Sequence, residues 1–196
     1  MNLVLKTPPA VEPISLVELK KHLRLDIEDT NEDIDLTAYL IAAREYCEDY
    51  QNRAYITQTW ERSFDYWPRS VIELPKGSLQ KVDLVSYKDS NGTIVELIEM
   101  VDYVFSARGI LGRITPAYGK TWPSFTPFPL DAIVIEFTCG YGDSATNIPA
   151  KTIQAMKMLT SHWYEHRTPL SETGQAPQEI AFAVSALLRG NRIEPT

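Results

Sequence analysis

The stretch that decides the fold is residues 137–167, FTCGYGDSATNIPAKTIQAMKMLTSHWYEHR. It starts with the end of a strand, and Gly140 and Gly142 favour a turn because glycine adopts backbone conformations that other residues avoid. Pro149 is typical of the first turn of a helix, and Asn147 is a candidate cap. The residues that then repeat at helical spacing are Ile153, Met156, Leu159 or Thr160, and Trp163. This segment therefore predicts a strand, a turn and a helix in succession.

The composition is that of an ordinary globular protein. The chain has 196 residues, of which 44% are hydrophobic and 23% are charged. No run approaches the roughly 18 apolar residues of a membrane span, and residues 1–13 lack the pattern of a secretory signal. Cys47 and Cys139 lie far apart, which fits two buried thiols in a reducing compartment. We expect a cytosolic protein that is later built into an assembly.

Helices are expected on both sides of the middle of the chain. Residues 15–24 begin with a capping-box pair and continue with leucines at helical spacing. Residues 36–52 carry one apolar stripe and predict a longer amphipathic helix. A breaker stretch at residues 168–177 indicates a linker, and residues 180–188 predict a short apolar helix that Gly190 ends.

The middle of the chain has the pattern of short strands. Residues 56–66 alternate with period two and place aromatic side chains on one face. Short apolar runs separated by turn residues follow as far as Phe137. Asn91 and Gly92 predict a hairpin turn because both tolerate a positive φ. The fold class is therefore α+β.

An acidic segment follows the first helix. Residues 26–52 carry nine acidic side chains against one base, Arg44, in a chain of net charge -7. Tight DNA binding is not expected, since nucleic-acid affinity comes mostly from cations placed at phosphates. Two interpretations remain open, an ordinary solvated helix face or an acidic wall that repels DNA and keeps it moving. The acids are Asp26, Glu28, Asp29, Glu32, Asp33, Asp35, Glu45, Glu48 and Asp49.

A proline-rich loop at residues 120–129, KTWPSFTPFP, contains Trp122, Phe125 and Phe128. Its three prolines exclude a central strand. The loop either covers an open sheet edge or protrudes as a contact loop, because aromatic rings held by rigid prolines make good interface anchors.

His162 and His166 are four residues apart and share one helix face, as a metal-binding pair requires. Glu165, however, precedes the second histidine, whereas the zinc-protease motif places its glutamate directly after the first. A structural pair at the end of a helix is the competing interpretation. A metal-dependent enzyme built on this pair therefore stays an alternative.

Other catalytic patterns are absent from the sequence. Gly140, Gly142 and Ala145 match a dinucleotide fingerprint in spacing, but Pro149 delays the helix and the upstream strands are joined by hairpins. No nucleophile elbow or phosphate-binding loop occurs. The residues predict no enzyme, no cofactor and no catalytic site.

Five blocks of the sequence together resemble the head-tail connector (adaptor) proteins of tailed bacteriophages and prophages. In that family a GYG turn leads to a helix that closes on His-Trp-Tyr-Glu, as residues 140–165 do here. The other blocks are SLVELKKHLR at 15–24, AAREYCE at 42–48, NRAYITQTW at 52–60 and AVSALLRGNR at 183–192. They stand in the order and spacing of the family and bracket nearly the whole chain.

The resemblance implies a helical core with a central antiparallel β-rich insertion. The expected parts are an N-terminal helical part at 1–56, the insertion at 57–146, a core helix at 147–168, and a linker with a terminal docking segment at 169–196. It also implies a structural protein of the virion neck that forms a ring, typically of twelve copies, beneath the portal. The ring would extend the DNA channel, with DNA only as cargo that does not stick, and carry the next neck or tail protein.

The resemblance also suggests roles for particular residues. The terminal segment would dock on the portal, with Leu187 and Leu188 as anchors and Arg189 and Arg192 paired with portal carboxylates or carbonyls; packing on its own subunit is the alternative. The docking residues are Ile180, Val184, Leu187, Leu188, Arg189, Arg192 and Ile193. The candidates for subunit contacts or the channel are Asp33, Arg44, Glu45, Glu48 and Asp49, with Arg44 as a partner for a neighbour's acid. Trp122, Phe125 and Phe128 would form a contact loop on the tail side.

One further alternative keeps the chain among phage proteins. It is a DNA-packaging accessory that binds DNA, which the acidic balance disfavours. No membrane contact is expected in either case.

Overall fold

The computed structural model describes residues 2–69, 71–166 and 178–194. They form two compact units, each made from two pieces of the chain. Unit 1 takes the described residues of Met1–Pro9 and Thr57–Tyr141, and unit 2 takes those of Ala10–Ile56 and Gly142–Thr196. The breaker stretch predicted at residues 168–177 lies outside the described residues.

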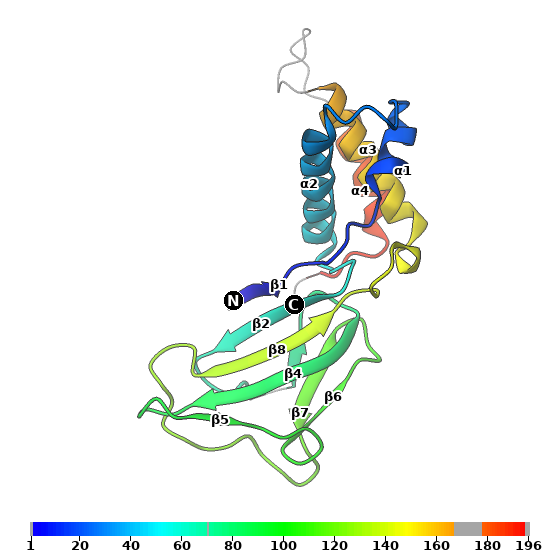
Figure 1. The fold of residues 1–196 in the computed structure, drawn as a ribbon. Helices are drawn as coiled ribbons and strands as arrows, with labels where there is room; N and C mark the ends of the chain where they lie inside the picture. Colours follow the sequence, from blue (N-terminus) through cyan, green and yellow to red (C-terminus); the bar gives the residue numbers. More distant parts are fainter. Residues whose placement is uncertain (1, 70, 167–177, 195–196) are drawn as a thin grey trace. The chain divides into compact units, whose positions relative to one another are not determined.

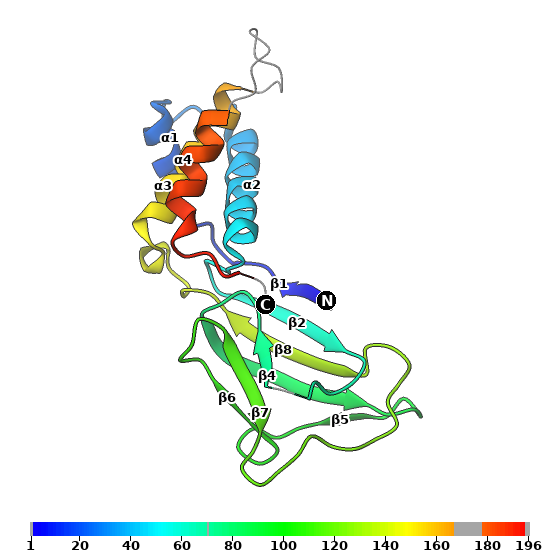
Figure 2. The ribbon, with the colours of Figure 1, turned by 180° about the vertical axis from the view of Figure 1, so that it is seen from behind.

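Unit 2 is helical, and Figure 1 and Figure 2 show its helices side by side. Its helices from the first half of the chain are α1 (Leu16–Leu23) and α2 (Asp33–Gln51), and those from the second half are α3 (Ala150–Glu165) and α4 (Gln178–Arg189). A short 3-10 turn, η1 (Ala145–Asn147), precedes α3. Helix α2 packs on α3 and α4, so both ends of the chain contribute to one helical core.

The expected helices at residues 15–24 and 36–52 are confirmed. Ser15 caps α1 by accepting a hydrogen bond from the backbone N–H of Glu18 at 3.2 Å. The apolar stripe of α2 is buried, including Leu36, Leu40 and Cys47, and Asn52 ends the helix in a left-handed conformation.

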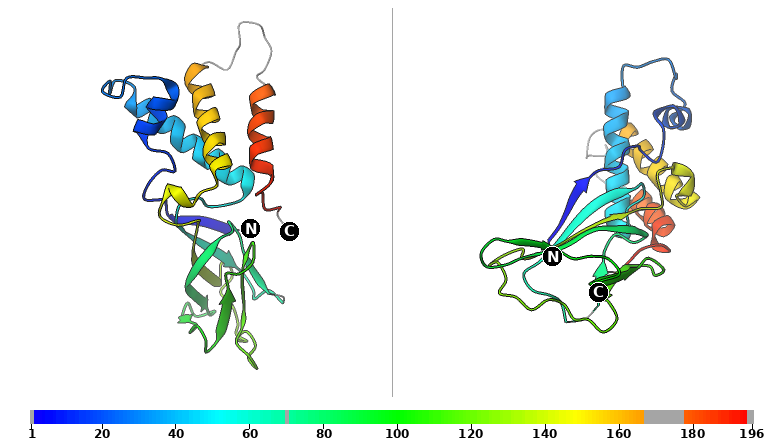
Figure 3. Two further views of the ribbon diagram at one scale, coloured as in Figure 1. Left: turned by 90° about the vertical axis from the view of Figure 1, so that its right-hand side faces the viewer. Right: turned by 60° about the horizontal axis from the view of Figure 1, so that its bottom comes forward.

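Unit 1 holds two antiparallel sheets, seen from two further sides in Figure 3. The larger sheet has the order β1-β2-β8-β4-β5, and the smaller has the order β3-β7-β6. The strands of the larger sheet are β1 (Asn2–Thr7), β2 (Gln58–Phe64), β4 (Leu79–Lys88), β5 (Ile94–Glu96) and β8 (Ile133–Cys139). Those of the smaller sheet are β3 (Ile72–Leu74), β6 (Tyr103–Ser106) and β7 (Gly112–Pro116).

The core of unit 1 is built from alternate residues of both sheets. Val85 and Ile135 of the larger sheet and Ile114 of the smaller one are fully buried. The hairpin predicted at Asn91 and Gly92 joins β4 to β5, and Gly92 has a φ of 87°. The α+β class, with a helical core and an antiparallel insertion, is therefore confirmed.

Two local expectations differ from the structure. Residues 1–56 were expected to be helical, but Asn2–Thr7 is strand β1. Its residues do not alternate between apolar and polar as those of a half-buried strand do, and they form a strand because they pair with β2. Asn147 was expected to cap the following helix, but Pro149 holds that position without a side-chain cap. Asn147 instead packs against Gly142, where an added Cβ would lie 2.5 Å from its side-chain nitrogen and φ is 134°.

Gly112 in β7 makes the tightest contact with the larger sheet, because an added Cβ would lie 2.4 Å from Cδ2 of Leu79. We predict that Gly112→Ala lowers the free energy of unfolding of unit 1 by about 1–3 kcal/mol, since overpacking forces the sheets to shift. Urea denaturation followed by tryptophan fluorescence measures the loss.

Gly190→Ala is the matched control for this prediction. Its added Cβ would meet only the end of the flexible Lys151 side chain, at 2.9 Å, and a smaller loss is expected. Equal losses for the two variants would contradict the prediction.

Candidate functional site

The terminal segment is fastened to its own helical unit. Val184, Leu188 and Ile193 are buried. The side chain of Gln51 donates a hydrogen bond to the carbonyl of Leu188 at 2.6 Å, and the N–H of Ile193 donates to the carbonyl of Gln51 at 2.9 Å. These three of the predicted docking residues therefore fill the core of unit 2, as the alternative of packing on the same subunit expects.

The opposite face of the segment is open. Phe182 is 76% exposed and Arg189 is exposed, while Leu187 is half-buried. Arg192 is also exposed, with its guanidinium 5.1 Å from the ring centroid of Tyr50. The side chain of Ile180 lies outside the described residues. Phe182 was not among the predicted docking residues, although it stands two positions before Val184 and so on the other side of the helix.

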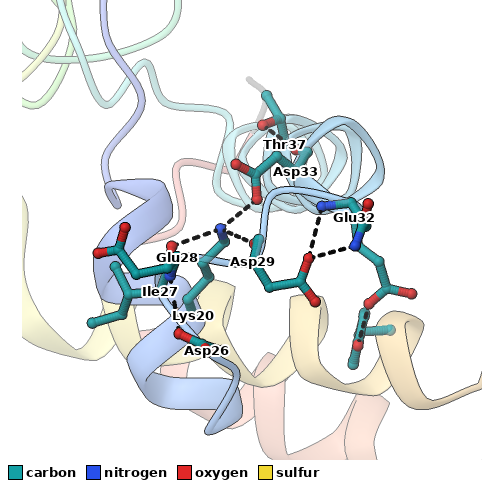
Figure 4. Close-up of polar contacts among 10 residues, drawn as sticks. Lys20, Asp26, Ile27, Glu28, Asp29, Glu32, Asp33 and Thr37 are labelled. Atoms are coloured by element: carbon teal, nitrogen blue, oxygen red, sulfur yellow. Dashed lines mark hydrogen bonds and ion pairs between the residues drawn. The ribbon is translucent and has the colours of Figure 1, made fainter.

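The acidic segment is organised around a buried lysine (Figure 4). Nζ of Lys20 lies 2.5 Å from a carboxylate oxygen of Asp33, and it donates to the carbonyls of Asp29 and Ile27 at 2.6 and 3.2 Å. A second contact holds the turn, because Asn31 donates to the side chain of Asp29 from both its backbone and its amide nitrogen. Asp33 is therefore neutralised within its own chain by a base that precedes the acidic segment.

Arg44 and Glu48 form a second internal network. Arg44 is buried and pairs with Glu12 at 2.9 Å and with Glu48 at 2.8 Å. Burial opposes the charge, but the carboxylates of Glu48 and Glu12 outweigh it, so the pKa of Arg44 is raised. Glu48 also accepts a hydrogen bond from the N–H of Tyr55 at 2.7 Å.

This network differs from the expected role of Arg44 as a partner for a neighbour's acid, because its charge is already matched inside unit 2. Glu48 is likewise buried and committed to internal contacts. Glu45 and Asp49 remain exposed. Of the five predicted contact or channel residues, these two are exposed, and Glu45 also lies 3.5 Å from the guanidinium of the buried Arg44.

The proline-rich loop rests on its own unit. Trp122 stacks on Trp67 with ring centroids 4.3 Å apart, and Phe125 contacts Tyr87 at 4.4 Å. Nζ of Lys88 lies 3.8 Å from the ring centroid of Phe128. All three predicted contact rings are half-buried. This packing agrees with a covering loop, and the role of the rings on the tail side stays a prediction.

The histidine pair lies at the end of α3, where the two rings are 4.6 Å apart. Burial, and then the charge of His166, lower the pKa of His162. Across residues 2–69, 71–166 and 178–194, no group of three or more His, Cys, Asp or Glu side chains could hold a metal ion. Burial also raises the pKa of Cys47 to about 12, which makes its thiol unreactive.

No helix in the described part of the chain is long and apolar enough to cross a membrane.

No protein-family model and no curated protein matches this chain. The chain is similar to solved structures, and in three of them the match covers 100% of this chain and 97% of the other. The first is a chain in the neck of an empty GTA particle computed with C6 symmetry, with a TM-score of 0.81 and 24% identity. The second is in the virion of a native gene transfer agent (GTA) particle, with 0.80 and 24%, and the third is in the neck of a native GTA particle computed with C12 symmetry, with 0.78 and 23%. The likeness shows that the whole chain shares the fold of these proteins.

The Arg44 network yields a prediction on stability. Arg44→Met should lower the free energy of unfolding of unit 2 by roughly 3 kcal/mol, because it leaves the buried carboxylate of Glu48 without its counter-charge. The helical circular dichroism signal during urea denaturation measures the loss. The control is Glu45→Gln, because Glu45 is an exposed partner of the same arginine. This substitution should change the free energy of unfolding by no more than about 0.5 kcal/mol. Similar losses in both variants would contradict the internal role of Arg44.

The lowered pKa of His162 yields a prediction on pH. The unfolded chain binds more protons than the folded chain between the lowered pKa and about 6.5, so the free energy of unfolding should fall as the pH decreases from about 7 to 5. Denaturation at several pH values should show a weaker pH dependence in His162→Gln. His166→Gln should weaken it less, because burial, the larger cause, remains. An unchanged pH dependence in His162→Gln would contradict the prediction.

Proposed function

We propose that this chain is a structural protein of the neck of a phage-like particle, a head-tail connector that forms a ring beneath the portal. The observation that carries the proposal is the likeness over the full chain to proteins of gene transfer agent necks. The five sequence blocks that resemble the connector family support it independently. The protein would then act in the virion neck, and in the host cytoplasm before assembly.

The proposed ring would hold twelve copies, extend the DNA channel and carry the next neck or tail protein. The C6 and C12 symmetries named for the similar neck structures are consistent with such a ring. The net charge of -7 agrees with a channel protein that does not retain DNA, since like charges repel. Glu45 and Asp49 are exposed acids that would contribute to this wall or to a contact between subunits.

The portal contact is assigned to the open face of the terminal segment. Val184, Leu188 and Ile193 support this segment from inside unit 2, while Phe182 and Arg189 offer an apolar ring and a cation to a partner. Arg192 is exposed as well, but it lies 3.5 Å from Glu194 of its own chain. Aromatic rings and arginines that become buried on binding are common at the centre of binding surfaces. The buried apolar residues thus hold the element in place, and the exposed ones make the contact.

Binding of the purified chain to its cognate portal ring tests the proposal. The full-length chain should bind with ring stoichiometry, and Phe182→Ser with Arg189→Glu should weaken binding at least tenfold, because the ring and the charge are lost together. Truncation after Thr173 would also remove core residues, so point variants are the sharper test. Tyr118→Ser, at an exposed ring of unit 1, is the control and should bind normally.

The outcomes separate two parts of the proposal. If the full-length chain does not bind the portal, the connector function is refuted. If the double variant binds as well as the full-length chain, the function stands and the assigned docking face is wrong.

A further inference from the structure

Both edges of the larger sheet expose apolar side chains. Strands β1 and β5 stand at the two ends of its strand order. In β1, Val4 is 53% and Leu5 41% exposed, and in β5, Ile94 is 65% and Val95 37% exposed. Edge strands that are apolar and open are sites where another strand can add, and proteins usually protect them. None of these four residues belongs to the surfaces described above.

The hydrogen bonds of β5 show which backbone groups face outward. The N–H of Leu97 donates to the carbonyl of Val85 at 2.8 Å, and the carbonyl of Thr93 accepts from the N–H of Asp89 at 3.0 Å. Backbone groups alternate in direction along a strand, so Thr93, Val95 and Leu97 face β4. Ile94 and Glu96 therefore turn their N–H and C=O groups toward the open edge.

In the smaller sheet, a side chain occupies an outward carbonyl of the edge strand β3. The guanidinium of Arg62, which comes from β2, donates to the carbonyl of Glu73 in the edge strand β3. The side chains of Ile72 and Leu74 on either side of Glu73 are buried. Among the described residues, no side chain donates a hydrogen bond to an outward carbonyl of β1 or β5. The larger sheet thus keeps two edges that are competent to pair.

The two edges are complementary in direction. Each neighbouring pair in the larger sheet is antiparallel, so β1 and β5, the first and the fifth strand, run in the same direction. Lys6, the only charged residue of β1, already pairs with Glu61 at 2.9 Å and lies 3.5 Å from Glu136, whereas the only charged residue of β5 is Glu96. Contact between two β5 strands would bring two Glu96 carboxylates together, which contact of β5 with the strand β1 avoids.

We propose that the β1 edge of one copy of this chain pairs in parallel with the β5 edge of the next copy, so that the sheet continues from subunit to subunit. Such a head-to-tail contact uses two different surfaces of each subunit, and it closes into a ring when the rotation between neighbours allows. A small rotation between neighbours preserves strand direction, which is why the pair is parallel. The closed ring rests on the proposed function, whereas the contact between the edges does not.

Cross-linking of the full-length chain tests the contact. The double variant Leu5→Cys with Val95→Cys places both thiols on the same face of the continued sheet, and with a short bismaleimide at high concentration it should give a ladder of dimers, trimers and larger species. Cys47 and Cys139 are buried and should not react. Each single variant alone should give no ladder, and an equimolar mixture of the two should give dimers and nothing larger. Absence of multimers in the double variant, or equal dimer formation by either single variant alone, would overturn the proposal.

A proline substitution tests the backbone contribution. Ile94→Pro removes an N–H that faces outward and leaves the bonds between β5 and β4 intact, so in the double-cysteine background it should reduce cross-linking at least tenfold. Ile94→Ala removes the same apolar side chain but keeps the N–H, and should reduce it less. Thermal unfolding checks that both variants are folded. Equal cross-linking by the proline and alanine variants would exclude strand pairing.

Portal binding by the same variants separates this inference from the proposed function. If the double-cysteine variant binds the portal but forms no ladder, the edge contact is refuted and the connector function stands. If it forms the ladder but the full-length chain does not bind the portal, the edge contact stands and the connector function is refuted.

Discussion

The helical unit depends on one buried amide, that of Gln51 at the end of α2. Its side chain and its backbone carbonyl bind the terminal segment at Leu188 and Ile193, and its side-chain oxygen accepts a hydrogen bond from the hydroxyl of Tyr55 at 2.7 Å. Each hydrogen bond contributes only about 1 kcal/mol to stability. Removing one partner would cost more than this, because it would leave a buried polar group of Gln51 without a hydrogen bond. Residues separated by the whole insertion are thereby held in one core.

This constraint determines what the terminal segment can do. Because Val184 and Leu188 are buried against the rest of unit 2, the face of α4 that can meet a partner is the one that carries Phe182. The apolar residues that look like anchors in the sequence thus hold the helix in place, and the proposed portal contact is left to exposed residues such as Phe182 and Arg189. In the proposed contact, folding and binding would use opposite faces of the same helix.

Buried cations have a similar effect on the acidic segment. Inside the unit, Lys20 pairs with Asp33, and Arg44 pairs with both Glu12 and Glu48. The remaining exposed carboxylates, such as Glu45 and Asp49, stand on a helix that these ion pairs help to orient. A wall that repels DNA requires carboxylates at fixed positions, and internal pairing supplies the fixed positions without removing all of the charge. In unit 1, Arg62 likewise binds the backbone of the edge strand β3, whereas the edge strands β1 and β5 of the larger sheet expose apolar side chains.

Local patterns were sufficient to predict much of the fold. The capped helix at 15–24, the stripe of α2, the hairpin at Asn91 and Gly92, and the α+β class follow from periodicity and turn chemistry, which act over a few residues. Strand β1 could not be predicted in this way, because residues 2–7 become a strand only by pairing with β2, more than fifty residues away. Candidate binding surfaces were predicted less well than helices and strands, because burial also depends on residues that are far away in the sequence. Whether Arg44, Leu188 or Phe182 is buried depends on Glu48, Gln51 and the partner helices, so the sequence by itself determined which residues form helices and strands, and only the tertiary structure decided which of their faces remain free to bind.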